Sequence, residues 1–157
     1  MVFLRHFIYT LFLLSILMVT SCDEDEILSI PVEQSMEITF STPAPVGDAS
    51  NTFELISRAY IRNISDQPIR VKVRRSIDNP TILTDNNSIC WEYCYVQSIE
   101  ESPDAIEIMP NEINQDFTGH VYPDGDGRSA EGEISYIFFN EDESRDLVTF
   151  TTNYKIQ

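Results

Sequence analysis

Basic residues are scarce in this chain of 157 residues, which has 10 Lys and Arg side chains against 26 Asp and Glu and a net charge of −16. An acidic excess of this size excludes docking on nucleic acid or on anionic lipid headgroups, because like charges repel. Solubility is the simpler explanation of the acidity, and a calcium-dependent surface is the alternative explanation.

Long apolar segments are lacking as well. The longest, Phe7 to Val19, has 13 residues and follows Arg5 and His6, whereas a membrane-spanning helix needs roughly 20. A short apolar run behind a polar start is typical of a secretory signal. We therefore expect residues 1–21 to be removed rather than to anchor the chain.

The end of that segment carries a cysteine motif. Val19-Thr20-Ser21-Cys22, with two small residues before the cysteine, resembles the bacterial lipobox. The resemblance implies cleavage before Cys22 and a diacylglyceryl group, with acyl chains such as palmitate, on its sulfur. The acid run Asp23–Glu26 is similar to the surface-export signal of Bacteroidota lipoproteins. This similarity implies an outer-membrane protein that is anchored by its lipid and faces the cell exterior.

Cysteine is rare, with three residues in all. With Cys22 lipidated, Cys90 and Cys94 remain as a pair in an oxidising compartment, where a disulfide is the expected state. Closing so short a loop adds only about 2 kcal/mol in the chain-entropy model, so its effect would be local. The alternative is half of a metal site, which would need two further ligands such as His120 and Glu92.

The rest of the chain alternates apolar and polar residues with a period of two, and no stretch has the period of a helix. Residues 22–34 are expected to be an acidic tether that carries the lipid, and residues 35–157 a folded domain. Seven or eight short strands separated by turn signals predict an all-β protein, an Ig-like antiparallel β-sandwich. The expected strands are Met36–Ser41, Phe53–Ile64, Ile69–Ser76, Cys90–Gln97, Ala105–Met109, Ile113–Tyr122, Glu133–Phe139 and Leu147–Ile156.

The few basic side chains gather on two of these strands. The turn Ser65–Pro68 predicts that Phe53–Ile64 and Ile69–Ser76 form a hairpin. In that hairpin the basic side chains would line one outward face and bind an acidic protein partner, a polyanionic glycan or a second copy of the chain. Protection of the sheet from unwanted pairing is the alternative explanation. The residues are Arg58, Arg62, Arg70, Lys72, Arg74 and Arg75.

Four ordered motifs resemble a known class of domain. They are Asn63-Ile64-Ser65-Asp66-x-Pro68, Cys90-Trp91-x-x-Cys94-Tyr95, His120-x-x-Pro123-x-Gly125-x-Gly127 and Ile134-x-Tyr136-x-Phe138-Phe139. In this order they resemble the small Ig-like or fibronectin-III-like domains of secreted and surface proteins of Bacteroidota. The resemblance implies a fold but no ligand, because such sandwiches host many functions, and it carries over no catalytic residue.

Three further features have both a functional and a structural interpretation. Trp91 and Tyr93, on a loop closed by a disulfide, are a contact tip for a partner, unless Trp91 instead fills the end of the core. Asp124 and Asp126 begin like a calcium loop but lack its later ligands, so a glycine-rich hairpin turn explains them more simply. His120 lies on an expected strand without a nucleophile motif such as Gly-x-Ser-x-Gly, which favours a structural role. No catalytic set, metal site or cofactor is therefore predicted.

These features predict a non-enzymatic lipoprotein of the cell surface, an adhesion or complex-assembly module that binds a protein partner. The predicted contacts are Trp91, Tyr93 and the basic face. The alternative is a carbohydrate-binding accessory lipoprotein of a surface glycan-uptake system. In that case Trp91, Tyr93 and Tyr95 would form a stacking platform for sugar rings.

Overall fold

The computed structural model describes residues 31–42, 44–81, 83–124 and 127–157. The expected signal segment, the expected lipidation site Cys22 and Asp126 of the calcium-like loop lie outside the described residues. The folded unit is Val32–Gln157. Within the described ranges, no helix is long and apolar enough to cross a membrane.

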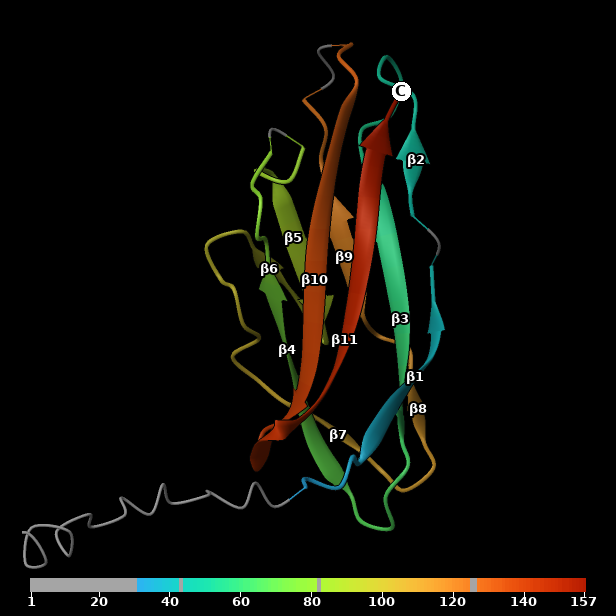
Figure 1. The fold of residues 1–157 in the computed structure, drawn as a ribbon, viewed down its shortest axis with the longest axis vertical. Helices are drawn as coiled ribbons and strands as arrows, with labels where there is room; N and C mark the ends of the chain where they lie inside the picture. The colour runs from blue at the N-terminus through green and yellow to red at the C-terminus, as the bar shows by residue number, and fades with distance from the viewer. Residues whose placement is uncertain (1–30, 43, 82, 125–126) are drawn as a thin grey trace, which may run out of the picture. The chain divides into compact units, whose positions relative to one another are not determined.

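One sheet contains six strands in the order β1-β3-β9-β5-β6, with β8 also pairing with β3 (Figure 1). All of its pairs are antiparallel. The strands are β1 Met36–Ser41, β3 Leu55–Asn63, β5 Asn87–Trp91, β6 Tyr93–Val96, β8 Ile113–Asn114 and β9 Thr118–Val121.

The second sheet contains five strands in the order β2-β11-β10-β4-β7. Its long pairs are antiparallel, and only the short β2 runs parallel to its neighbour β11. The strands are β2 Val46–Gly47, β4 Ile69–Ser76, β7 Ile106–Ile108, β10 Ala130–Asn140 and β11 Glu143–Ile156. Two such sheets packed face to face make an Ig-like β-sandwich, which confirms the predicted fold class.

The strands are more numerous than expected because some predicted segments are divided. The segment Cys90–Gln97 belongs to a hairpin of β5 and β6, and Ile113–Tyr122 contains both β8 and β9. Among the described residues, the shortest strands, β2 and β8, have two residues each. Segments this short carry too few side chains for an alternating pattern to be recognised.

The core lies between the sheets and follows from the period-two pattern. On β4 the residues Ile69, Val71 and Val73 are buried while their neighbours face outward. Aromatic rings fill the centre, where Phe117 packs edge-on against Tyr136 and Phe138 at centroid distances of 4.8 and 4.9 Å. Burying side chains of this size stabilises the fold by about 1.5–3 kcal/mol each.

The expected hairpin between the two basic strands is wrong. Strand β3 pairs with β1, β8 and β9, whereas β4 pairs with β10 and β7 in the opposite sheet. The Ser65–Pro68 turn exists, but it carries the chain from one sheet to the other. Because both strands have one apolar and one polar face, sequence pattern alone does not distinguish pairing within a sheet from packing across two sheets.

Asn63 fixes the crossing between the sheets. Its side-chain Oδ1 accepts a 2.8 Å hydrogen bond from the backbone N–H of Ser65, and its Nδ2 donates to the carbonyls of Gln67 at 2.8 Å and Ile108 at 2.9 Å. The last of these contacts joins the turn to β7, at the edge of the second sheet. An Asn side chain thus satisfies backbone groups that a tight turn leaves unpaired.

Candidate functional site

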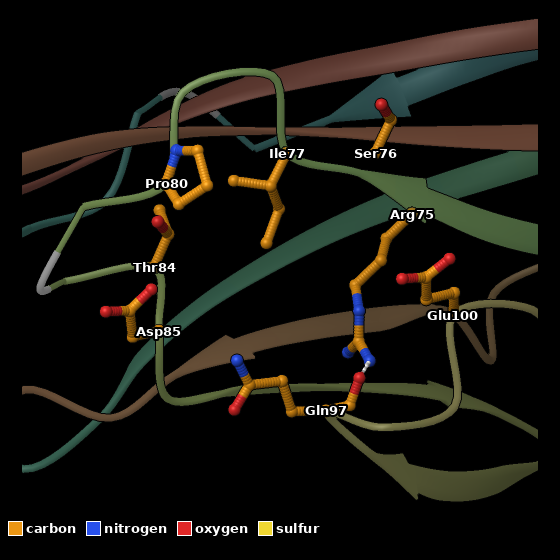
Figure 2. A pocket seen from close by; sticks show the side chains of 8 residues that line it. All are labelled: Arg75, Ser76, Ile77, Pro80, Thr84, Asp85, Gln97 and Glu100. Carbon is orange, nitrogen blue, oxygen red and sulfur yellow. Dashed lines mark hydrogen bonds between the residues drawn. The ribbon is translucent and has the colours of Figure 1, made fainter.

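The described residues form surface cavities, two of which are relevant to the candidate sites. One, of about 410 Å³, surrounds the inward-facing Arg75 at the end of β4 (Figure 2). Its lining consists of Arg75, Ser76, Ile77, Pro80, Thr84, Asp85, Gln97 and Glu100. The other is a shallow groove of about 470 Å³ beside β6, lined by Asn86, Asn87, Ser88, Cys94, Tyr95, Val96, Gln97, Ser98 and Tyr122. Both volumes lie within the range of roughly 300–1,000 Å³ typical of small-ligand sites.

The predicted disulfide between Cys90 and Cys94 is present and joins β5 to β6. The two cysteines face each other directly in the hairpin register. Glu92 lies at the tip of this hairpin with a positive φ of 63°. With both sulfurs bonded to each other, neither cysteine is a free thiolate ligand. Among the described residues, no group of three or more His, Cys, Asp or Glu side chains could hold a metal ion.

Trp91 is not a surface contact, which corrects its predicted role at the hairpin tip. Its side chain is 0% exposed, and its Nε1 donates a 2.8 Å hydrogen bond to the carbonyl of Val71. Its ring packs edge-on against Phe138 at 5.6 Å. Trp91 therefore fills the core, as the alternative interpretation proposed, and the platform of Trp91, Tyr93 and Tyr95 does not form. Tyr93 is 61% exposed and stays a predicted contact.

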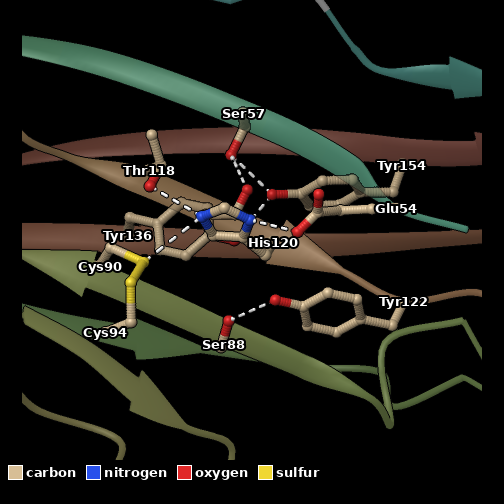
Figure 3. Close-up of polar contacts among 11 residues, drawn as sticks. Glu54, Ser57, Ser88, Cys90, Cys94, Thr118, His120, Tyr122, Tyr136 and Tyr154 are labelled. Atoms are coloured by element: carbon tan, nitrogen blue, oxygen red, sulfur yellow. Dashed lines mark hydrogen bonds and ion pairs between the residues drawn. A yellow bond between two sulfur atoms is a disulfide. The ribbon is translucent and has the colours of Figure 1, made fainter.

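His120 on β9 is the centre of a polar cluster on the outer face of the first sheet (Figure 3). Its Nδ1 lies 2.8 Å from Oε1 of Glu54, and its Nε2 lies 2.8 Å from the hydroxyl of Thr118. The Nε2 atom is also 3.4 Å from Sγ of Cys90 in the disulfide. These contacts connect the His120 ring to a carboxylate on one side and to a hydroxyl on the other.

The order of carboxylate, imidazole and hydroxyl in this cluster matches that of a nucleophilic triad. However, Thr118 lies within β9 and pairs in register with Arg58 and Cys90 on its two neighbouring strands. We call the groove beside β6 the tyrosine groove, after Tyr95 and Tyr122 in its lining. Thr118 and His120 line neither this groove nor the cavity at Arg75. A nucleophile needs adjacent space for its substrate. The cluster is therefore best explained as a polar connection between β9, β5 and the residue before β3.

A second group of hydroxyls lies inside the sandwich, beneath the outer cluster (Figure 3). The hydroxyl of Tyr154 lies 2.6 Å from Oγ of Ser57 and 2.8 Å from the hydroxyl of Tyr136. Burial, followed by the neighbouring Tyr154, raises the pKa of Tyr136 well above its usual value. Burial also raises the pKa of Tyr154. These hydroxyls are satisfied by one another and hold the two sheets in register.

The predicted basic side chains do not form a single face, because they belong to opposite sheets. Arg58 and Arg62 lie on β3, while Arg70, Lys72 and Arg74 lie on β4. Arg75, also expected to face outward, is buried. The contact of the other five with a partner stays a prediction, now divided between two surfaces.

Several of these basic side chains have local partners. Arg70 contacts a carboxylate oxygen of Glu141 at 2.7 Å, and Lys72 lies 3.3 Å from the other oxygen. Hydrogen bonds from the Arg70 and Lys72 side chains lower the pKa of Glu141. The guanidinium of Arg74 lies 5.4 Å from the ring centroid of Phe139, a cation–π contact. Local pairing of this kind leaves less positive charge available for a partner.

The long strand β11 has an outer edge that is mostly unpaired. It has 14 residues, and β2 pairs with it only at Lys155 and Ile156 (Figure 1). Within the part of the chain that the structure describes, no backbone hydrogen bond joins another strand to this edge between Leu147 and Asn153. We call Leu147–Asn153 the open edge.

The open edge also lacks the residues that usually discourage pairing with another strand. It has no charged residue and no proline, and it contains the β-branched residues Val148, Thr149, Thr151 and Thr152. The other edges have features that discourage pairing. Strand β1 has a bulge between Ile38 and Phe40, β7 has three residues including Glu107, and β6 has only four residues. The sequence could have revealed the open edge through its lack of charge, but not its position in the sheet.

The fold and its surfaces define an Ig-like β-sandwich domain. Comparison with known proteins finds no matching family model and no matching curated protein. Among solved structures, the N-terminal domain of PorA matches with a TM-score of 0.52 and 18% identity over 81% of each chain. A PapD-like domain of human CEP192 matches with a TM-score of 0.45 and 14% identity over 84% of this chain and 90% of that one.

A FixG-related protein from Vibrio parahaemolyticus matches with a TM-score of 0.46 and 12% identity over 80% of this chain and 96% of that one. At such low identities, the likeness to the PorA domain concerns the fold alone. It agrees with the Ig-like topology and leaves function to the surfaces of this chain.

Proposed function

We propose that this chain is a non-enzymatic surface lipoprotein whose sandwich binds a protein partner through the open edge of β11. The partner would contribute an extended segment that pairs with Leu147–Asn153 as an additional strand. This mode of recognition uses the backbone for affinity and alternate side chains for specificity. The single observation that carries the proposal is the long unpaired and uncharged edge of β11.

The backbone geometry of β11 indicates which groups a partner strand would use. The amides of Lys155 and Gln157 donate to carbonyls of Pro45 and Gly47, on the side away from β10. Backbone direction alternates along a strand, so the odd-numbered residues direct their N–H and C=O groups to this outer side. Thr149, Thr151 and Asn153 are the exposed residues of this set within the open edge.

The outer face of the second sheet adds a chemical preference next to the open edge. Thr149 pairs with Ile137 on β10, which pairs with Arg74 on β4, so these three side chains form one row across the sheet. Arg70 and Lys72 follow on β4. A partner segment with acidic residues on this side would be attracted to the basic side chains. In this proposal Arg70, Lys72 and Arg74 on β4 remain contacts of the partner.

The lipid anchor places this domain at the outer membrane, facing the cell exterior. Residues 22–34 would join the lipidated Cys22 to the sandwich. A fully extended chain reaches about 3.5 Å per residue, so this tether would allow the domain to stand roughly 45 Å from the bilayer. That distance is enough to reach a partner beside the anchor.

The test is a pull-down with the full lipidated chain from detergent-solubilised outer membranes. Thr149→Pro removes one outward N–H of the open edge, and a proline is compatible with an edge strand. Thr149→Val keeps the N–H and is the matched control. The proposal expects a stoichiometric protein partner with the native chain and with Thr149→Val, but not with Thr149→Pro. Equal recovery with both variants, or no partner at all, would contradict it.

Glycan binding is the second candidate, and the tyrosine groove beside β6 is the observation that favours it. Tyr95 and Tyr122 line this groove together with the polar side chains of Asn86, Ser88 and Gln97. Sugar rings bind to such combinations of aromatic and hydrogen-bonding groups. A glycan array with the native chain and with Tyr122→Ala tests it. A signal lost only in Tyr122→Ala would favour this candidate over strand addition.

A further inference from the structure

Arg75 places a positive charge at the end of an otherwise apolar strand face. On β4, the side chains of Ile69, Val71 and Val73 face the core, and Arg75 is the next residue of the same face. Arg75 is only 6% exposed. A buried guanidinium is costly unless its charge is balanced and its donors are used.

The two terminal nitrogens of the Arg75 guanidinium differ in their hydrogen bonding. Nη2 donates to the backbone carbonyls of Val96 at 3.2 Å, Ile99 at 2.9 Å and Gln97, which fixes the loop after β6. Nη1 is buried and has no hydrogen-bond partner. Among the described residues, no Asp or Glu forms an ion pair with Arg75. Burial lowers the pKa of Arg75 below its ordinary value.

The unused side of the guanidinium belongs to the cavity of about 410 Å³. Figure 2 shows that one terminal nitrogen of Arg75 meets Gln97, while the other points into the space bounded by Thr84, Asp85 and Gln97. Ile77 and Pro80 form an apolar wall on the same cavity. The site therefore combines a buried cation, a free donor and an apolar surface.

We propose that the Arg75 cavity binds a small monocarboxylate, with the carboxylate on Nη1 and a short aliphatic body against Ile77 and Pro80. An anion at Nη1 would balance the buried charge and satisfy the free donor at once. A carboxylate fits better than a phosphate, because a phosphate has more charge and more acceptor oxygens than one terminal nitrogen can satisfy. The carboxylate can come from a free organic acid or from the C-terminus of a peptide.

Two acidic residues at the cavity limit the affinity and provide a means to test it. Asp85 and Glu100 line the cavity, and both are exposed. Their charges repel a bound carboxylate, which again favours a ligand with a single negative charge. Removing one of these charges should tighten binding by about two- to fivefold, the effect of a partly screened charge at this range. Neither carboxylate forms an ion pair with Arg75. Glu100 contacts Arg75 through its backbone carbonyl, which accepts a 2.9 Å hydrogen bond from the Arg75 N–H, and Glu100→Gln keeps that carbonyl.

The test uses the full chain, solubilised in a neutral detergent and labelled with ¹⁵N-arginine, and sodium butyrate as the probe. Titration should shift the side-chain N–H signal of Arg75 in a saturable manner, while sodium chloride at equal ionic strength should not. Asp85→Asn and Glu100→Gln should tighten binding, whereas Asp66→Asn, an exposed acid at the distant β3–β4 turn, should not. Arg75→Lys, checked for folding by circular dichroism, should weaken binding at least tenfold.

Two peptides distinguish the sources of the carboxylate. A short peptide with a free C-terminus that binds more tightly than butyrate, and loses binding when amidated, identifies a peptide terminus as the ligand. Equal affinity for butyrate and the peptide identifies a free organic acid. No saturable shift, an equal shift with chloride, or affinities unchanged by Asp85→Asn and Glu100→Gln would overturn the proposal. The site does not involve the open edge, so its outcome is independent of partner binding.

Discussion

The carboxylate of Asp146 accepts a 2.9 Å hydrogen bond from the backbone N–H of Ser35, which lies 111 residues earlier in the chain. The Ser35 hydroxyl donates to the other carboxylate oxygen, and Nδ2 of Asn140 lies 3.3 Å from that same oxygen. Asp146 is 3% exposed. One buried acid thus joins the first residues of the domain to the start of its last strand.

We expect Asp146→Ala to destabilise the domain by about 1–3 kcal/mol, because it leaves the partly buried donors of Ser35 and Asn140 without an acceptor. The free energy of unfolding, measured in urea, checks the size of the effect. The exchange rate of the Ser35 amide should rise at the same time. Asp142→Ala removes an exposed acid from the turn between β10 and β11 and should change neither quantity; equal effects of both variants would contradict the role of Asp146.

Gly119 lies too close to Tyr136 to carry a side chain. A Cβ atom at this position would lie 2.3 Å from the Tyr136 hydroxyl and 2.8 Å from Oγ of Ser57. Gly119→Ala should therefore destabilise the domain by about 1–3 kcal/mol through overpacking. Combining it with Tyr136→Phe, which removes the nearest obstructing atom but leaves the ring carbon Cζ at 2.5 Å, should recover part of the loss in a double-mutant cycle. Strict additivity of the two changes would show that the contact is unimportant.

Stability should fall at alkaline pH because of the buried tyrosines. Burial, with Tyr154 nearby, raises the pKa of Tyr136 well above its usual value, whereas tyrosine in the unfolded chain titrates near pH 10. The stabilisation is complete below about pH 10 and is lost as the pH rises further, because the unfolded chain then loses its proton first. Urea unfolding over a pH series should show this decline, with a smaller slope in Tyr136→Phe. An unchanged slope would contradict it.

Removing the disulfide should have a local effect. Replacing both Cys90 and Cys94 by serine should lower the free energy of unfolding by about 2 kcal/mol, because the loop that they close is short. Amide exchange should increase in β6 and at the hairpin tip, while Trp91 keeps its buried fluorescence. A Trp91 spectrum shifted to that of an exposed indole would show that the disulfide supports the core and not only the hairpin.

The sequence predicted the fold class because the alternation of apolar and polar residues survives in the long strands. Segments such as Met36–Ser41 and Ile69–Ser76 have the same bounds in the structure. Strand pairing was less predictable, since a period of two identifies the buried face but not the neighbouring strand. The chain therefore crosses between sheets at Ser65–Pro68, where a hairpin was expected.

The sequence likewise predicted some features of the candidate sites and not others. The Cys90–Cys94 disulfide followed from spacing and compartment, and it is present. Trp91 could be assigned to the surface or the core only once its position opposite Phe138 was known. Adjacent side chains of a strand point to opposite faces of the sheet. Arg74 faces outward, and Arg75, the next residue, therefore faces inward. The open edge depends on the position of β11 in the sheet, which no local pattern specifies.

Amide hydrogen exchange along β11, with and without the captured partner, tests strand addition most directly. The account predicts that partner binding slows exchange at Thr149, Thr151 and Asn153, whose amides face the open edge. The amides of Phe150 and Thr152, directed toward β10, should already be slow and change little. Exchange at the outward amides that is the same in the free and bound protein would contradict binding at this edge.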